Sequence, residues 1–387
     1  MLLAIITILL AQDPLAARPV DEWPVVDEPP DPFCFVDGTH VRTLNDWEKR
    51  RKEMKELIMG IEYGNVPPPP GNVGLEEVIE SKTRYGGLTH YERIRLTMGP
   101  DNKLFMPVKL YVPKNVSGPC PVIIRFGLDD KFAGLMNQRG FAYACFEHQI
   151  LDPDTEGYDV PGPAQITYPD CDWGGLAVWA WGASRVLDYL ETRPDINCEQ
   201  AIITGHSRTG KAALLTGVLD KRFAMVVPNG SGCGGAAMYR DTAAGAETLK
   251  LITLESRWRC WFKKDFARFS DKENRLPFDQ HFMRALVAPR LVLSTDGLGD
   301  TWANPPGTQT AWAAAQPVFE FLGVPENNLC HFREGGHDQR REDYVVLLDV
   351  ADWYFRDKKL DVDFSKVPVP DLKPAWSWDA PEPSANE

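Results

Sequence analysis

Short apolar runs alternate with amphipathic stretches along most of the chain. Between residues 91 and 113, two runs of alternating apolar and polar residues flank a Gly-Pro-Asp-Asn turn, which predicts an antiparallel hairpin. Continuous apolar runs follow, typical of strands buried on both faces, at 121–126, 141–146, 225–228, 291–294 and 329–333. Helical periodicity lies between them, at about 174–192 and 309–322, and after the last of them, at 340–356. This alternation predicts a single α/β domain with a doubly wound, mostly parallel sheet and an antiparallel N-terminal hairpin.

The two ends of the chain differ from this pattern. Residues 1–17 begin with an apolar run too short to span a bilayer and continue with small residues, which predicts a signal peptide and a secreted or periplasmic protein, although a basic start is missing. Residues 18–43 are rich in proline and acid and predict an extended lead-in. A charged amphipathic helix at 44–63 then opens the α/β domain, expected over 44–360 and followed by a tail at 361–387.

Composition narrows the class of partner. The chain has 387 residues, 43% of them hydrophobic, and a formal net charge of −13. This charge and the absence of a Lys/Arg block argue against a nucleic-acid partner, and no membrane partner is expected. The eight cysteines allow up to four disulfide bridges in an exported protein, although Cys120 and Cys145 lie in or beside apolar strands and fit buried thiols equally well. Their spacing does not resemble a zinc site, so we expect no metal.

The stretch from Ile202 to Lys211 predicts a strand, a tight turn and a helix, with Ser207 at the turn. A serine at such an elbow is lifted clear of the sheet, and the amides that open the helix point toward whatever it attacks. The usual elbow is G-x-S-x-G, but here Thr209 takes the place of the second glycine, which is displaced to Gly210. A structural N-cap serine would give a similar pattern. Both interpretations are compatible with these ten residues.

The α/β-hydrolase order of a nucleophilic serine, then an acid, then a histidine favours the nucleophile. Asp296 and Asp300 follow the strand at 291–294, and His337 lies on a glycine-rich loop after the strand at 329–333. A histidine there can accept the serine proton, while a carboxylate fixes its tautomer. Asp296 and Asp300 compete for that role, whereas Asp338 adjoins His337 and would need an unusual turn to reach the ring.

The residues around the elbow resemble a known family. Gly205-His206-Ser207-Arg208-Thr209-Gly210-Lys211 is similar to the G-C-S-R-x-G-K motif of the glucuronoyl esterases, carbohydrate esterase family 15. Other similar stretches are spread along most of the chain: Asn45 to Arg51, Tyr63-Gly64, Trp179 to Gly182, Trp261-Phe262 and Leu276 to His281. The resemblance accounts for the displaced glycine, and it implies a single-domain α/β-hydrolase.

The resemblance also implies roles for individual residues. Ser207 matches the nucleophile, Arg208 the arginine that holds the oxyanion, and Lys211 the lysine that hydrogen-bonds glucuronate hydroxyls. Fungal members carry their triad acid where Gly230 stands here, whereas many bacterial members use an acid in a D-x-W setting. Asp300-Thr301-Trp302 matches that setting. The resemblance therefore favours Asp300 over Asp296 and His337 as its partner.

Further candidates for the sugar site are weaker. Trp302 either packs on the sugar or belongs to the protein interior. Glu247 and either Gln280 or His281 match sugar-site positions, but Glu247 fits a solvated helix residue as well. His206 and Asp338 replace two cysteines that bridge the triad loops in fungal members, so packing or another bridge must hold the His337 loop.

The resemblance predicts a monomeric, exported serine esterase without a cofactor. Its expected activity is that of a 4-O-methyl-glucuronoyl methylesterase, acting on esters that join xylan glucuronate to lignin alcohols. An acetyl xylan esterase or related carbohydrate deacetylase is the alternative enzyme. A third alternative is an inactive sugar-binding protein with the hydrolase fold.

Overall fold

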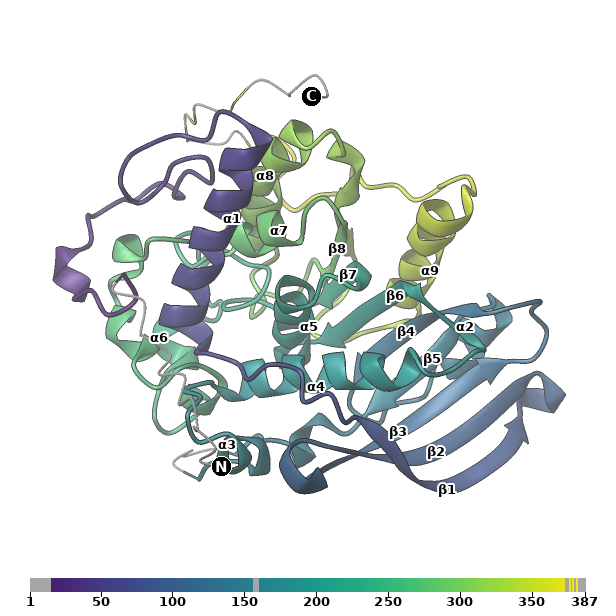
Figure 1. The fold of residues 1–387 in the computed structure, drawn as a ribbon. Helices are drawn as coiled ribbons and strands as arrows, with labels where there is room; N and C mark the ends of the chain where they lie inside the picture. The colour runs from purple at the N-terminus through teal and green to yellow at the C-terminus, as the bar shows by residue number, and fades with distance from the viewer. Residues whose placement is uncertain (1–14, 156–159, 373–375, 377, 379–380, 382–387) are drawn as a thin grey trace, which may run out of the picture.

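The computed structural model describes residues 15–155, 160–372, 376, 378 and 381. A sheet of nine strands crosses the molecule in the order β1-β2-β3-β5-β4-β6-β7-β8-β9 (Figure 1). The strands are β1 (Gly74–Arg84), β2 (Thr89–Met98), β3 (Leu104–Pro113), β4 (Cys120–Phe126), β5 (Ala142–Phe146), β6 (Ile196–His206), β7 (Phe223–Asn229), β8 (Leu291–Gly297) and β9 (Asn328–Arg333).

The sheet is antiparallel at one side and parallel over the rest. β1, β2, β3 and β5 pair antiparallel in that order, and every pair from β5 through β4 to β9 is parallel. The predicted hairpin is confirmed as β2 and β3. The edge strand β1 was not predicted, because its side chains are almost all partly or fully exposed and show no apolar alternation.

Helices cover both faces of the sheet. They are α1 (Leu44–Ile58), α2 (Ala133–Gln138), α3 (Pro163–Thr167), α4 (Gly175–Leu190), α5 (Arg208–Leu219), α6 (Leu249–Ile252), α7 (His281–Val287), α8 (Pro305–Phe321) and α9 (Arg341–Arg356). One buried cluster joins α2 and α9 to a face of the sheet, and a larger one joins α1, α4, α5, α7 and α8 to the other (Figure 1). The predicted class, a doubly wound α/β-hydrolase sheet, is confirmed.

The strand side chains explain this layering. In β4, Val122 and Ile124 belong to the larger cluster, whereas Ile123 between them belongs to the smaller one. Successive side chains on a strand point to opposite faces, so a continuous apolar run is what a strand needs when helices cover both sides. Because β6, β7, β8 and β9 are parallel, their carboxyl ends lie at one edge of the sheet. Ser207, Asp300 and His337 follow β6, β8 and β9 at this edge.

The segment at 18–43 has little regular structure but is not a solvated arm. A single 3₁₀ turn, Val20–Glu22, is followed by Trp23, Phe33 and Val41, whose side chains are buried in the main core. The predicted signal peptide lies outside the described residues except for its last three positions. Among the described residues, no helix is long and apolar enough to cross a membrane.

No disulfide bridge is present among the described residues, although the even number of cysteines allows up to four. All eight cysteines lie among the described residues, and each is a free thiol. Cys120 and Cys145 are buried in strands β4 and β5, as the alternative interpretation had it. Within the same described part of the chain, no group of three or more His, Cys, Asp or Glu side chains is placed to hold a metal ion.

Candidate active site

Ser207 occupies the elbow between β6 and α5. Its backbone has φ 57° and ψ −125°, a conformation that is strained for any residue other than glycine. Its amide donates to the carbonyl of Asn229 at the end of β7, at 2.9 Å, which fixes the turn on the neighbouring strand. A side chain at Gly205 would bring its Cβ within 2.2 Å of the Thr209 carbonyl oxygen, so the close return of the chain requires glycine there.

The displaced glycine has a structural reason. The Thr209 hydroxyl accepts from the His206 amide at 2.9 Å and donates to the His206 carbonyl at 2.8 Å, so it braces the turn. Gly210 lies where α5 touches the end of β7, and a Cβ there would stand 2.8 Å from the carbonyl oxygen of Asn229. The second glycine of the elbow is therefore needed at 210, not at 209.

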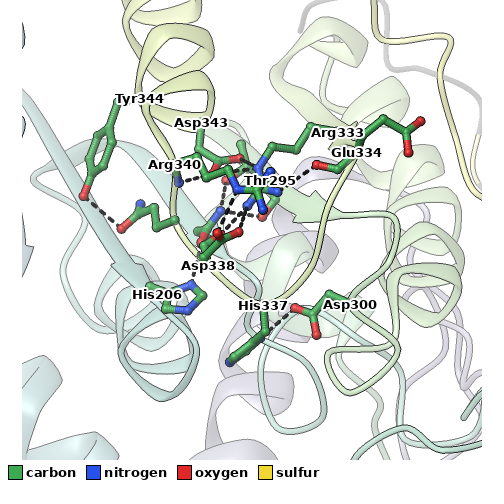
Figure 2. Close-up of polar contacts among 12 residues, drawn as sticks. His206, Thr295, Asp300, Arg333, Glu334, His337, Asp338, Arg340, Asp343 and Tyr344 are labelled. Atoms are coloured by element: carbon green, nitrogen blue, oxygen red, sulfur yellow. Dashed lines mark hydrogen bonds and ion pairs between the residues drawn. The ribbon is translucent and has the colours of Figure 1, made fainter.

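Ser207, His337 and Asp300 form one chain of hydrogen bonds. The Ser207 Oγ lies 2.9 Å from His337 Nε2, and His337 Nδ1 lies 2.6 Å from Asp300 Oδ2. Figure 2 shows the histidine and the aspartate facing each other from the two loops that follow β9 and β8. Asp300 is buried, and its second oxygen accepts from the Ala303 amide at 3.2 Å, so the carboxylate is held on both sides.

The structure separates the candidate acids. Asp296 lies within β8, fully buried, and neither of its oxygens has a hydrogen-bond partner among the described residues. Burial, together with the nearby charge of Asp300, raises the pKa of Asp296 to about 7. Asp338 points away from the ring of His337 and pairs instead with Arg333 and Arg340. Of the candidates, only Asp300 contacts the histidine.

Gly230 lies directly beside this acid. A Cβ at Gly230 would be 3.5 Å from Asp300 Oδ2, and the residue has φ +50°. The ends of β7 and β8 are adjacent in the sheet, so an acid after either strand is directed at the same place. This geometry explains how an acid at 300 can stand in for one at 230.

Arg208 is the first residue of α5 and lies beside the serine. Its backbone N–H has no acceptor within the helix, because the first turn of any helix leaves its amides free. Its guanidinium pairs with the carboxylate of Asp154 and lies over the ring of Trp261, 5.5 Å from its centroid. The Trp261 Nε1 donates to the same carboxylate at 2.8 Å. Asp154 was not predicted, although it follows β5 at the edge of the sheet where the other candidates lie.

Lys211 and Glu247 form a buried ion pair. The Lys211 Nζ lies 2.7 Å from Glu247 Oε2 and donates to the carbonyls of Ser231 and Cys233, both at 2.6 Å. Both side chains are 5% exposed or less. The alternative of a solvated helix glutamate is therefore wrong, because Glu247 is buried and lies in the loop before α6. An ammonium group has three N–H donors, and all three are engaged in this structure.

Three indole rings stand together beside this ion pair. Trp258 stacks on Trp261, with centroids 4.9 Å apart and ring planes 6° apart, and meets Trp302 edge to face at 6.3 Å. The Trp302 carbonyl accepts from the amide of Glu247 at 3.0 Å, which places this tryptophan next to the ion pair. Trp258 was not predicted, because it lies in a polar, irregular segment without periodicity.

Two of the weaker candidates lie in the interior. Gln280 is fully buried, and its side-chain amide nitrogen donates to both oxygens of Glu62 at 3.3 Å. Burial raises the pKa of Glu62 to about 8. His281 is also fully buried, with Nε2 on the Pro30 carbonyl at 2.8 Å. The structure therefore brings neither Gln280 nor His281 to the triad.

His206 places a second imidazole next to His337. The two ring centroids are 4.7 Å apart, and His206 Nδ1 lies 2.7 Å from the Asn229 side-chain oxygen. Burial lowers the pKa of His206 to about 4, so this ring is neutral at neutral pH. A neutral neighbour places no second positive charge against His337 when His337 takes up a proton.

The chain is similar in sequence to a known protein family and to curated esterases. Residues 96–323 match the protein family described as "Glucuronyl esterase, fungi". The chain is 30% identical over 390 residues to carbohydrate esterase MZ0003 from an unknown prokaryotic organism, a match that covers 84% of this chain and 88% of the relative. It is 32% identical over 329 residues to a 4-O-methyl-glucuronoyl methylesterase of Schizophyllum commune, covering 80% and 77%.

A solved structure extends the likeness to the whole fold. The carbohydrate esterase family 15 glucuronoyl esterase from Caldicellulosiruptor kristjansonii superposes with a TM-score of 0.80 at 34% identity, over 92% of this chain and 98% of that one. The family match spans more than half of the chain and includes the elbow and the acid loop. The chain therefore belongs to the glucuronoyl esterases of carbohydrate esterase family 15.

Proposed function

We propose that this protein hydrolyses esters of 4-O-methylglucuronate, with Ser207, His337 and Asp300 as its catalytic triad. The observation that carries the proposal is the hydrogen-bonded chain from Ser207 Oγ through His337 to Asp300 in a member of this esterase family. A curated relative at 32% identity is named 4-O-methyl-glucuronoyl methylesterase, which supports the same substrate here.

In the first half of the reaction, Ser207 Oγ attacks the ester carbonyl while His337 Nε2 takes its proton. Asp300 accepts the Nδ1–H of the imidazole and stabilises the cation that forms. The carbonyl oxygen becomes negative as the tetrahedral intermediate forms, and the free N–H of Arg208 and its guanidinium are the donors that stabilise it. His337 then gives its proton to the departing alcohol, which leaves the glucuronoyl group on Ser207.

In the second half, water repeats these steps against the acyl-enzyme. His337 accepts a proton from the water, the oxygen attacks the acyl carbon, and collapse of the intermediate returns the proton to Ser207. The products are the free glucuronate and the unmodified enzyme. The alcohol is the group released first. The proposed natural substrate is an ester between xylan glucuronate and a lignin alcohol, which is then the departing alcohol.

The sugar is held, in this proposal, by polar groups around Lys211 and by an aromatic wall. Lys211 and Glu247 offer charged hydrogen-bonding groups to ring hydroxyls, and Trp302 offers a flat apolar face next to them. Export to the periplasm or the medium, where plant polymers are met, completes the proposal, with the enzyme acting as a monomer.

The test compares ester types on one preparation. The wild-type protein should hydrolyse benzyl glucuronate, and Ser207→Ala should abolish this activity while leaving the melting temperature intact. Much faster hydrolysis of acetylated xylan than of benzyl glucuronate would point to the deacetylase instead. A wild-type protein that hydrolyses neither ester and resists serine-directed probes would identify an inactive sugar-binding protein.

A further inference from the structure

The loop that carries His337 contains two glycines and no covalent tie. Gly335 has φ +107°, and its carbonyl accepts from the Gly299 amide at 2.8 Å. All eight cysteines of the chain are free thiols. A loop with two adjacent glycines has high conformational entropy when it is unrestrained. The His337 ring nevertheless lies within hydrogen-bond distance of both Ser207 and Asp300, so noncovalent contacts must order the loop.

One buried guanidinium contacts this loop on both sides of the histidine. Arg333, at the end of β9, donates from one terminal nitrogen to the Glu334 carbonyl at 3.0 Å. Its other terminal nitrogen donates to the carbonyl of Asp338 and to the Asp338 carboxylate, the latter at 3.0 Å. Glu334 and Asp338 lie immediately before the glycines and immediately after the histidine. The planar fork of Arg333 therefore spans the base of the loop (Figure 2).

Asp343 holds Arg333 in this orientation. The Arg333 Nε lies 3.0 and 2.9 Å from the two oxygens of the Asp343 carboxylate, and both side chains are 5% exposed or less. Asp343 also accepts from the Arg340 amide at 2.7 Å, which closes the first turn of α9. The loop is thus joined through Arg333 to a helix that packs on the core. Because the guanidinium is rigid and planar, fixing its Nε edge also fixes the directions of its other donors.

The contacts on the far flank of the loop are longer. Gln339 donates to the Thr204 hydroxyl at 3.4 Å and accepts from Arg125 at 3.5 Å, with one short bond from the Tyr344 hydroxyl at 2.9 Å. Hydrogen bonds to charged groups are roughly twice as strong as those between neutral groups. Arg340 also donates to the Asp338 carboxylate, at 2.7 Å, but of these groups only Arg333 contacts the segment on both sides of the histidine.

We propose that Arg333 is a positioning residue that, paired with Asp343, holds the His337 loop in register with Ser207 and Asp300. It touches neither the substrate nor the reacting atoms. Arg333 affects the reaction rate because it fixes the position of the His337 imidazole. This inference rests on the proposed triad but adds to it the residue pair that takes the place of a covalent tie at the loop.

The experiment uses Arg333→Gln and Arg333→Lys in the full chain. Glutamine removes the charge and most of the donors, whereas lysine keeps the charge opposite Asp343 but loses the rigid fork. The matched control is Arg139→Gln, which removes another arginine that anchors α9, through Asp352 at 2.5 Å, at the end of the helix away from the loop. The measurements are the melting temperature, kcat and KM on benzyl glucuronate, and the rate at which a fluorophosphonate labels Ser207.

We expect kcat and the labelling rate to fall by about 10²-fold in Arg333→Gln with KM little changed, because a displacement of about 1 Å at a reacting group costs about that much. Arg333→Lys should keep most of the melting temperature and still lose much of kcat. Arg139→Gln should lower the melting temperature without lowering kcat.

Three results would overturn the proposal. The first is a folded Arg333→Gln with the kcat of the wild type. The second is an equal loss of kcat in the Arg139 control, which would mean that any destabilisation of α9 lowers kcat. The third is a rise in KM at constant kcat. If Arg333→Gln does not fold, Arg333→Lys decides by the same criteria. A wild-type protein that labels at Ser207 but leaves benzyl glucuronate intact would refute the proposed function alone, since the labelling rates still test the positioning role.

Discussion

Lys211 and Glu247 are bonded to each other in the interior, Nζ to Oε2 at 2.7 Å, although both were expected to meet a substrate. The ammonium also serves the carbonyls of Ser231 and Cys233, so its donors are occupied in the free protein. For Lys211 to bind a sugar hydroxyl, the hydroxyl must share or replace one of these acceptors. The pair therefore has a structural role and a proposed binding role, and these can be separated.

The separation uses one single and one double substitution. Lys211→Met leaves the buried charge of Glu247 without a partner and should lower the free energy of unfolding by about 3–5 kcal/mol, whereas Lys211→Met with Glu247→Leu should recover much of that loss. Neither variant should recover activity on glucuronate esters. Urea unfolding and kcat/KM on benzyl glucuronate measure the two effects. Recovery of activity in the double variant would show that the pair is structural only.

Asp300 and Asp296 make a second matched comparison. We expect Asp300→Asn to lower kcat by about 10⁴-fold, because the amide favours the wrong tautomer of His337. Asp296 lies in β8, four residues before Asp300, and does not contact the histidine. Asp296→Asn should therefore leave kcat near that of the wild type. Steady-state kinetics on benzyl glucuronate decide between them. The opposite ranking would make Asp296 the functional acid.

The buried Asp296 also predicts a pH dependence of stability. Its pKa is about 7 in the folded protein, raised from 3.8 by burial and by Asp300. Between these values the unfolded chain has released the proton that the folded chain still holds, so the free energy of unfolding falls as pH rises toward about 7. Asp296→Asn removes this loss. It should be more stable than the wild type by a few kcal/mol above pH 7, since each pKa unit is worth about 1.4 kcal/mol, and the advantage should vanish near pH 4.

Chemical denaturation at a series of pH values measures this effect. The informative quantity is the difference in unfolding free energy between Asp296→Asn and the wild type, because other titrating groups cancel in it. A difference that stays constant from about pH 4 to pH 8 would mean that the carboxyl group is not held protonated in the folded protein.

The free thiols give a fourth prediction. Because no bridge joins the eight cysteines, a reducing agent should not change the melting temperature. Unfolding in iodoacetamide without a reductant should add eight carbamidomethyl groups by mass spectrometry. A smaller mass increase, together with a lower melting temperature after reduction, would show that disulfide bridges form in the protein.

Sequence alone determined the central strands, the elbow and the chemical class of the site. A strand that is buried on both faces is apolar along its length, so continuous apolar runs predict β4 and β5. The strand–serine–helix pattern around Ser207 can be predicted because its residues are adjacent in the sequence. The order of serine, acid and histidine followed from the same local patterns. The edge strand β1 could not be predicted from the sequence, because a strand that buries neither face shows no regular alternation of apolar residues.

Only the tertiary structure decided which groups meet. Asp296 and Asp300 lie four residues apart after the same apolar run. Their roles differ because Asp296 lies within β8, whereas Asp300 lies in the loop beyond the strand and contacts His337. Gln280 turned into the interior toward Glu62, and Arg333 came to span the His337 loop. Contacts of this kind join elements far apart in the chain, and packing sets them to within an ångström or less. Apart from the Asp300-Thr301-Trp302 match, by which the family resemblance favoured Asp300, no local pattern of residue types carries that information.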